Sequence, residues 1–270
     1  MVDSGDRNPI VVGVKTAAPE SPAVRLAGAE ALLRGRPLHI VHAFVWPPFT
    51  SPDGDGAGYG SPRQDAERIV ADAIAEARAD RPGLTVSGEV VDGAALETLV
   101  NLSARAALLV LGNNTLRRSV TLPVESLAVQ ASARAGCPVI IADGSERPDA
   151  PVVVGVDGSP WMAPALDLAF EEAELRDVPL IVVQAGGNER AAAGVHHPLL
   201  HTTLSPWLAR HPRVQVEQRV VAEPPTEALG DLSHKAQLLV VGARGWQARL
   251  LGSVTQAMLL HADCPVAVGR

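Results

Sequence analysis

The feature that most constrains the fold of this chain is an internal repeat. Four segments of the first half recur in the same order in the second half, at offsets that fall from 142 to 130 and then to 127 residues. Because self-similarity of this kind is the signature of tandem structural units, we predict two copies of one domain, residues 1–146 and 147–270. The paired segments are residues 10–14 with 152–156, 36–43 with 178–185, 108–112 with 238–242, and 137–139 with 264–266.

The change in offset shows where the two copies differ in length. The fall from 142 to 130 residues places an insertion in the first copy, in the stretch 46–62 that is rich in Pro, Gly and Ser. The further fall from 130 to 127 residues places a deletion in the second copy, between Gly245 and Gly252. This deletion bears on function because it shortens the loop that follows an apolar strand.

Short apolar runs alternate with helical patterns in both copies. The stretch 65–80 is the clearest helix, because its apolar residues recur every three or four positions with charged residues between them. Fully apolar strands that alternate with helices indicate a parallel sheet covered on both faces. We therefore predict two tandem, doubly wound, five-stranded α/β domains of the Rossmann-like type. Strands are expected near residues 10–14, 38–44, 84–91, 107–111 and 138–142 of the first copy, and helices near 95–105, 125–135, 159–176, 226–234 and 252–262, with Ser159 as a helix cap.

The stretch 237–257 is the first candidate for a binding site. An apolar strand there runs into a loop that contains Gly242 and Gly245, and a helix start follows at Gly252. A strand, loop and helix in this order can bring main-chain N–H groups and the positive end of a helix to a phosphate. If the strand order is 3-2-1-4-5, the loops after the first and fourth strands meet at the edge of the sheet where such folds bind ligands. We therefore expect Asp157 to lie beside Gly242.

The composition excludes several classes of protein. Asp and Glu number 30 against 23 Lys and Arg, and the chain has no basic block, which argues against a nucleic-acid-binding surface. No apolar run approaches the roughly 18 residues that span a bilayer, and the polar start of the chain is unlike a signal peptide. Two cysteines, Cys137 and Cys264, cannot form a disulfide framework and are interpreted as packing residues. We expect a cytoplasmic protein with neither a nucleic-acid nor a membrane partner.

Four motifs of the second copy carry a family resemblance. They are V-G-V-D-G-S at residues 154–159, L-V-V-G-A-R-G at 239–245, G-S-V-T-Q-A at 252–257 and C-P-V at 264–266. Together they resemble the universal stress protein family, in the tandem two-domain form common in actinobacteria. The resemblance covers the chain apart from residues 46–62 and 186–197. It implies a fold like that of the adenine nucleotide alpha hydrolases, a role in stress response and the binding of an adenine nucleotide.

The resemblance also implies where that nucleotide binds. In ATP-binding members an Asp follows the first strand and the motif reads G-x2-G-x9-G-[S/T]. The second copy has each of these residue types, but six residues instead of nine separate Gly245 from Gly252. We therefore expect AMP or ADP to suit this loop better than ATP, with Mg²⁺ as an accompanying ion. The predicted nucleotide-binding residues are Asp157, Gly158, Ala185, Gly242, Arg244, Gly245, Gly252, Ser253 and Val254.

The first copy departs from the motif in its residues and not in its length. Thr115 and Glu125 stand at two of the glycine positions, and Lys15 stands where the second copy has Asp157. A carboxylate at position 125 would repel a phosphate at the helix start. We therefore expect the ligand in the second copy only.

Two functions remain open from the sequence. One is a nucleotide-responsive regulatory module, and the other is a tandem scaffold that has lost nucleotide binding and acts through protein–protein contacts. An enzyme is not expected, because the G-x-S-x-G, Walker A, C-x-x-C and H-E-x-x-H motifs are missing. A slow ATPase has little support, since only Asp157 stands out as a Mg²⁺ ligand. No catalytic residue and no metal-ligating residue is predicted, and His196, His197 and His201 are interpreted as part of a solvated stretch.

The closing strands, residues 139–142 and 266–268, concern assembly. They are apolar and are expected at sheet edges, where strands tend to pair. In the resembled family, domains associate through this strand. We therefore predict that the two copies pair within the chain as a pseudo-dimer, and we further expect a homodimer and an unidentified protein partner.

Overall fold

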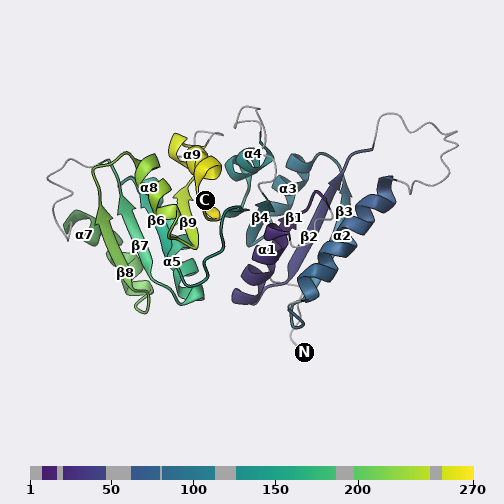
Figure 1. Cartoon of the computed structure of the whole chain (residues 1–270), viewed down its shortest axis with the longest axis horizontal. Helices are drawn as coiled ribbons and strands as arrows, with labels where there is room; N and C mark the ends of the chain where they lie inside the picture. Colours follow the sequence, from purple (N-terminus) through teal and green to yellow (C-terminus); the bar gives the residue numbers. More distant parts are fainter. Residues whose placement is uncertain are drawn as a thin grey trace, which may run out of the picture. The chain divides into compact units, whose positions relative to one another are not determined.

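The computed structural model describes residues 8–16, 21–46, 62–79, 81–112, 126–186, 198–243 and 251–270. The chain divides into two compact units, residues 1–112 and 113–270. Strands and helices alternate in both units (Figure 1), as the apolar pattern of the sequence predicts. The predicted α/β fold is therefore confirmed.

The strands described in the first unit form a parallel sheet in the order β3-β2-β1-β4. Between them the chain forms helices whose apolar sides pack on the sheet. The elements are β1 (Ile10–Gly13), α1 (Pro22–Leu33), β2 (Leu38–Phe44), α2 (Pro62–Ala79), β3 (Val86–Asp92), α3 (Ala95–Ser103) and β4 (Leu108–Gly112).

The second unit has the strand order β8-β7-β6-β9-β10-β5. Its strands from β6 onward follow the predicted order 3-2-1-4-5, so the first and fourth strands of the second copy, β6 and β9, are neighbours. The elements are α4 (Leu127–Arg134), β5 (Val139–Ala142), β6 (Val152–Val156), the 3₁₀ helix η2 (Pro160–Met162), α5 (Ala163–Arg176), β7 (Leu180–Gln184), α7 (Pro198–Arg210), β8 (Val216–Val220), α8 (Pro225–Ser233), β9 (Leu238–Gly242), α9 (Ser253–His261) and β10 (Val266–Gly269).

The closing strands of the two copies pair with each other, as predicted. Strand β5 runs antiparallel to β10, with Ile140 opposite Ala267, and β10 also pairs with β9. Both residues are fully buried, which is the reason that these strands consist of apolar residues alone. The prediction of a pseudo-dimer of whole domains stays a prediction.

The expectation of fully apolar strands is wrong for the third strand of each copy. Both β3 and β8 contain polar residues. In β3, exposed residues such as Ser87 and Glu89 stand between buried or half-buried ones, and in β8 Glu217 is exposed while the other residues are half-buried. Both are edge strands, because each pairs with a single neighbouring strand among the residues that the structure describes. Two arginines of α2 donate hydrogen bonds to main-chain carbonyl oxygens of β3. Arg78 donates to Val86 O at 2.9 Å, and Arg63 donates to Val90 O at 3.3 Å.

The cores of both units contain a buried carboxylate that the sequence reasoning missed. Glu30 in α1 and Glu172 in α5 are fully buried and occupy equivalent positions of the repeat. Each pairs with an arginine one helical turn later, Glu30 with Arg34 and Glu172 with Arg176. The spacing of four residues was visible in the sequence, but burial of the pairs depends on how the helices pack on the sheets.

Within the described residues, no helix combines the length and hydropathy that a bilayer span requires.

Candidate functional site

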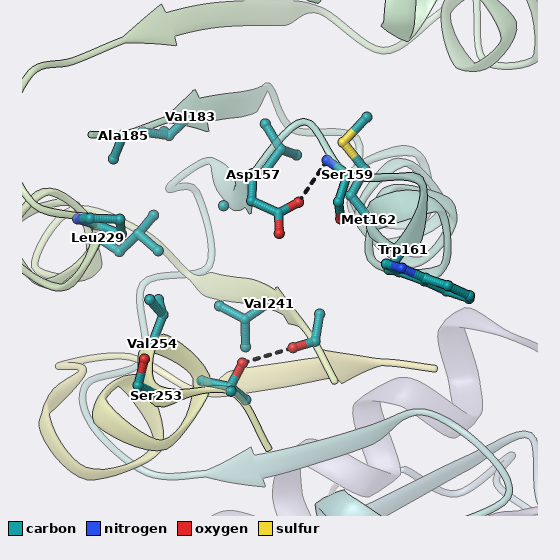
Figure 2. Close-up of a pocket in the computed structure, with 16 residues that line it drawn as sticks. Asp157, Ser159, Trp161, Met162, Val183, Ala185, Leu229, Val241, Ser253 and Val254 are labelled. Atoms are coloured by element: carbon teal, nitrogen blue, oxygen red, sulfur yellow. Dashed lines mark hydrogen bonds between the residues drawn. The ribbon is translucent and has the colours of Figure 1, made fainter. Parts of the chain in front are cut away.

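A pocket of about 370 Å³ opens at the carboxyl ends of β6, β7 and β9 in the second unit. The loops that leave these strands and the starts of α8 and α9 form its walls (Figure 2). Strands β6 and β9 are adjacent, and the strands that follow them in sequence, β7 and β10, lie on opposite sides of this pair. The pocket is therefore at the topological switch point, where doubly wound sheets bind ligands. The pocket is lined by Gly155, Val156, Asp157, Ser159, Trp161, Met162, Val183, Ala185, Pro225, Leu229, Val241, Gly242, Gly252, Ser253, Val254 and Thr255.

Asp157 carries the only formal charge among these lining residues of the described chain. One carboxylate oxygen, Oδ1, accepts a hydrogen bond from the main-chain N–H of Ser159 at 2.9 Å, which makes an Asx turn. Gly158 lies inside this turn with a φ of +75°, a conformation that strongly favours glycine. The turn directs the carboxylate across the pocket toward Val241 (Figure 2).

The turn also corrects the expected role of Ser159. Its side chain makes no capping hydrogen bond to the helix that follows. Asp157 accepts the bond from the main chain of Ser159 instead, so the Asp side chain organises the start of the helix.

The start of α9 forms another wall. Its N-cap residue is Gly252, which has no side chain to bond the N–H groups of the first turn. The positive end of the helix dipole and these N–H groups favour an anion at this position. Thr255 Oγ1 donates to Gly242 O at 2.7 Å and thereby holds the helix start against the end of β9.

Gly242 leaves space in the pocket. A Cβ atom built on this glycine would meet no atom of the other described residues within 4 Å. By contrast, a Cβ on Gly155 would lie 2.7 Å from Leu229 Cδ1, so that glycine is required for close packing of α8 on β6. Gly242 therefore borders open volume, whereas Gly155 supports the wall.

The pocket brings together most of the residues that the sequence predicted. Asp157, Ala185 and Gly242 come from the ends of three strands. Gly252, Ser253 and Val254 come from the start of α9, and Gly158 supports the adjacent turn without lining the pocket. Arg244 and Gly245 lie outside the described residues.

The sequence matches a known family model twice. The model of the "Universal stress protein family" matches residues 7–143 and 150–270. The chain belongs to this family.

Relatives in the family share the tandem arrangement over their whole length. Two universal stress proteins of Mycobacterium tuberculosis are 35% and 34% identical to this chain, and each match covers 97% of this chain and 96% of the relative. The crystal structure of a universal stress protein from Archaeoglobus fulgidus DSM 4304 has a TM-score of 0.76, with 14% identity, over 98% of this chain and 99% of that one. The structural likeness supports the fold.

As a universal stress protein with two domains, the chain presents a different surface at the strand ends of its first unit. Lys15, which follows β1, is exposed where the second unit has Asp157. After β2, the rings of Phe44 and Trp46 meet edge to face at 5.1 Å between centroids, and the Arg63 guanidinium lies 5.7 Å from the centre of the Phe44 ring. A cation and an aromatic cluster thus replace the carboxylate turn.

Several lining residues of the pocket were missed by the sequence reasoning. Leu229 and Pro225 come from α8, which no nucleotide motif includes. Trp161 follows the V-G-V-D-G-S motif by two positions. Because only 3% of the residues in the chain are aromatic, a tryptophan so close to this motif was a signal that could have identified it as a pocket residue.

The cysteines give no sign of redox chemistry. Both are buried, and burial raises the pKa of the Cys264 thiol to about 12. The interpretation of Cys264 as a packing residue agrees with this shift, because a protonated thiol is a poor nucleophile. Among the residues that the structure describes, no group of three His, Cys, Asp or Glu side chains is arranged to hold a metal ion.

Proposed function

We propose that the second domain of this universal stress protein binds an adenine nucleotide in the pocket at the ends of β6, β7 and β9. The observation that carries the proposal is the meeting of Asp157, the open space at Gly242 and the start of α9 in one pocket. The volume of about 370 Å³ falls near the lower end of the roughly 300–1,000 Å³ that small-molecule sites occupy.

The residues present fit the parts of such a ligand. The apolar groups of Val183, Ala185 and Leu229 suit the faces of a base. The Asp157 carboxylate can accept hydrogen bonds from ribose hydroxyls or from an amino group. The N–H groups at the start of α9 suit a phosphate.

The electrostatics favour few phosphates. Asp157 adds a negative charge to the described lining, and like charges repel in a partly buried site. The sequence between Gly245 and Gly252 is also three residues shorter than the family's motif. The proposed ligand is therefore AMP or ADP before ATP. If Mg²⁺ accompanies it, Asp157 and phosphate oxygens supply its ligands, since this ion prefers oxygen.

In the cell we propose a regulatory role in the cytoplasm. Nucleotide binding would change the protein's affinity for a protein partner, and such coupling requires that the ligand favour one conformation over another. Hydrolysis is not part of the proposal.

A substitution at Gly242 tests the site. A Cβ there enters open space, so Gly242→Val fills the pocket without a clash and should leave the fold intact. We expect the affinity for AMP, measured by calorimetry, to fall by about tenfold or more. Gly112→Val, at the equivalent strand end of the first unit, is the matched control and should bind AMP like the wild type. Equal affinities in all three proteins would contradict the proposed site.

The alternative is a scaffold that binds no nucleotide, and the shortened loop favours it. The two functions differ in what accompanies the gently purified protein. Adenine nucleotide at a substantial fraction of one equivalent, identified by absorbance and chromatography after denaturation, supports binding. Protein that carries none, and that takes up none of AMP, ADP or ATP at millimolar concentration, supports the scaffold.

A further inference from the structure

Trp161 is an exposed aromatic side chain on the wall of the pocket. It belongs to η2, lines the pocket and is 55% exposed. It is the single aromatic residue among those that line the pocket in the described chain. A large aromatic side chain on the wall of a pocket is a candidate ligand contact, because small-molecule sites are lined mainly by apolar and aromatic side chains.

The local backbone holds Trp161 in this position. The Asx turn at Asp157 and the positive φ of Gly158 lead directly into η2. The N–H of Met162 then donates to Ser159 O at 3.2 Å, and the Met162 side chain is 92% buried, which anchors the end of the 3₁₀ turn. The turn that places the Asp157 carboxylate therefore also places the indole.

Trp207, a tryptophan of the same unit that does not line the pocket, has its indole N–H paired within the protein. Its Nε1 donates to Asp167 Oδ1 at 2.8 Å, and the Arg210 guanidinium lies 5.5 Å from the ring centre. Within the described residues, the indole N–H of Trp161 has no such acceptor. Tryptophan N–H groups that become buried usually find a hydrogen-bond partner, so a covering ligand would be expected to offer one.

The position of Trp161 defines which end of a ligand it can reach. Figure 2 shows Trp161 beside Met162 on one side of the pocket, with Ala185 and Leu229 on the other side. A base that packs near Ala185 and Leu229, with its phosphate at the start of α9, leaves the sugar to face Asp157 and the wall that carries Trp161.

We propose that Trp161 is a ligand-contacting residue, which packs its ring against the sugar of the bound nucleotide and donates its N–H to a ligand oxygen. This inference rests on the proposed function. Its consequence is that binding buries the ring and that the site favours a nucleotide over a free base, which lacks the sugar.

Fluorescence and calorimetry test the contact together. The chain has four tryptophans, so the triple variant Trp46→Phe, Trp207→Phe, Trp246→Phe leaves Trp161 as the single indole emitter. With AMP as the probe, we expect a saturable change in its emission at the same concentrations at which calorimetry detects binding. We expect Trp161→Ala to weaken AMP binding about fivefold or more through the lost apolar contact and hydrogen bond, and Trp161→Phe to weaken it less because a ring remains.

Controls separate the contact from the fold and from the proposed function. Trp207→Phe removes a tryptophan outside the pocket lining and should bind AMP like the wild type, and Trp161→Ala should keep the wild-type circular dichroism spectrum because the side chain is exposed. If wild type and Trp161→Ala bind AMP equally and the emission of Trp161 does not change, the contact is overturned while the proposed function stands. If the wild type binds none of AMP, ADP or ATP, the proposed function fails and this inference falls with it.

Discussion

The two copies of the repeat agree in their cores and differ at their strand ends. Gly13 and Gly155 occupy equivalent positions in β1 and β6, and a Cβ on either would press on a leucine of the equivalent helix, Leu99 or Leu229. Ser103 and Ser233, at the ends of α3 and α8, are both buried and both donate to a carbonyl three residues earlier at 2.6 Å.

The strand ends agree in part: Gly112 corresponds to Gly242 and Ala43 to Ala185, but charged and aromatic residues differ. Lys15 replaces Asp157, and at the end of β2 the exposed Trp46 meets Phe44 edge to face. The comparison teaches that packing and binding are separate requirements on one fold. Residues that hold helices to the sheet recur in both copies, and so do apolar pocket residues such as Leu229, which corresponds to Leu99, whereas the carboxylate of Asp157 occurs in the second copy alone.

The largest expected effect tests the shared core. Glu30→Ala and Glu172→Ala each remove the buried carboxylate of an ion pair with an arginine, so each should lower the free energy of unfolding by about 3–5 kcal/mol. Urea denaturation followed by circular dichroism measures the change. Glu217→Ala, which removes an exposed pair with Arg219, is the control and should cost less than about 1 kcal/mol. A large loss in one copy alone would show that the pairs are not equivalent.

The next effect tests the difference at the strand ends. Asp157→Ala should weaken AMP binding by about 1.5–3 kcal/mol, since it removes a charged hydrogen-bond acceptor from the pocket. Lys15→Ala, at the equivalent place in the first copy, should leave the affinity unchanged. Calorimetric titration of both variants decides the point. Weaker binding by the Lys15 variant would mean that the first copy takes part in binding.

A smaller effect combines packing with binding. Gly155→Ala places a methyl group 2.7 Å from Leu229 Cδ1, and Gly13→Ala places one 2.9 Å from Leu111 Cδ2. Each should destabilise the protein by about 1–3 kcal/mol through overpacking. Only Gly155→Ala should also weaken AMP binding, because Leu229 lines the pocket. Thermal denaturation and calorimetry of the two variants separate the effects, and equal AMP affinities would show that the wall tolerates the shift.

The smallest effect concerns an ion pair that the first copy lacks. Arg147 donates to Asp263 Oδ2 at 2.7 Å, which lowers the pKa of Asp263, with His234 as a further partner; the equivalent of Asp263 in the first copy is Gly136. A carboxyl group with a lowered pKa stabilises the fold above its unfolded pKa, and this stabilisation is lost as the pH falls through the folded pKa.

We therefore expect Asp263→Asn to cost less than about 1 kcal/mol at neutral pH, because the pair is partly exposed. The difference from wild type should shrink below about pH 4 and then vanish, which denaturation curves across this pH range can measure. A difference that persists at lower pH would point to the main-chain contacts of this segment instead of the charge.

The order 3-2-1-4-5 entered the sequence analysis only as a condition, which the second copy fulfils. The sequence itself determined the repeat, the alternation of strands and helices and the family. These follow from local patterns, because apolar periodicity and glycine spacing depend on neighbours in the chain. It also placed Asp157 beside Gly242, since strand order fixes which loops meet.

The tertiary structure was needed to show the burial of Glu172, the antiparallel direction in which β5 pairs with β10, and the presence of Leu229 and Trp161 at the pocket. Each depends on contacts between segments far apart in the chain. The spacing of apolar residues in a helix is visible in the sequence. Which of its side chains contact the sheet or line the pocket depends on how one element packs on another.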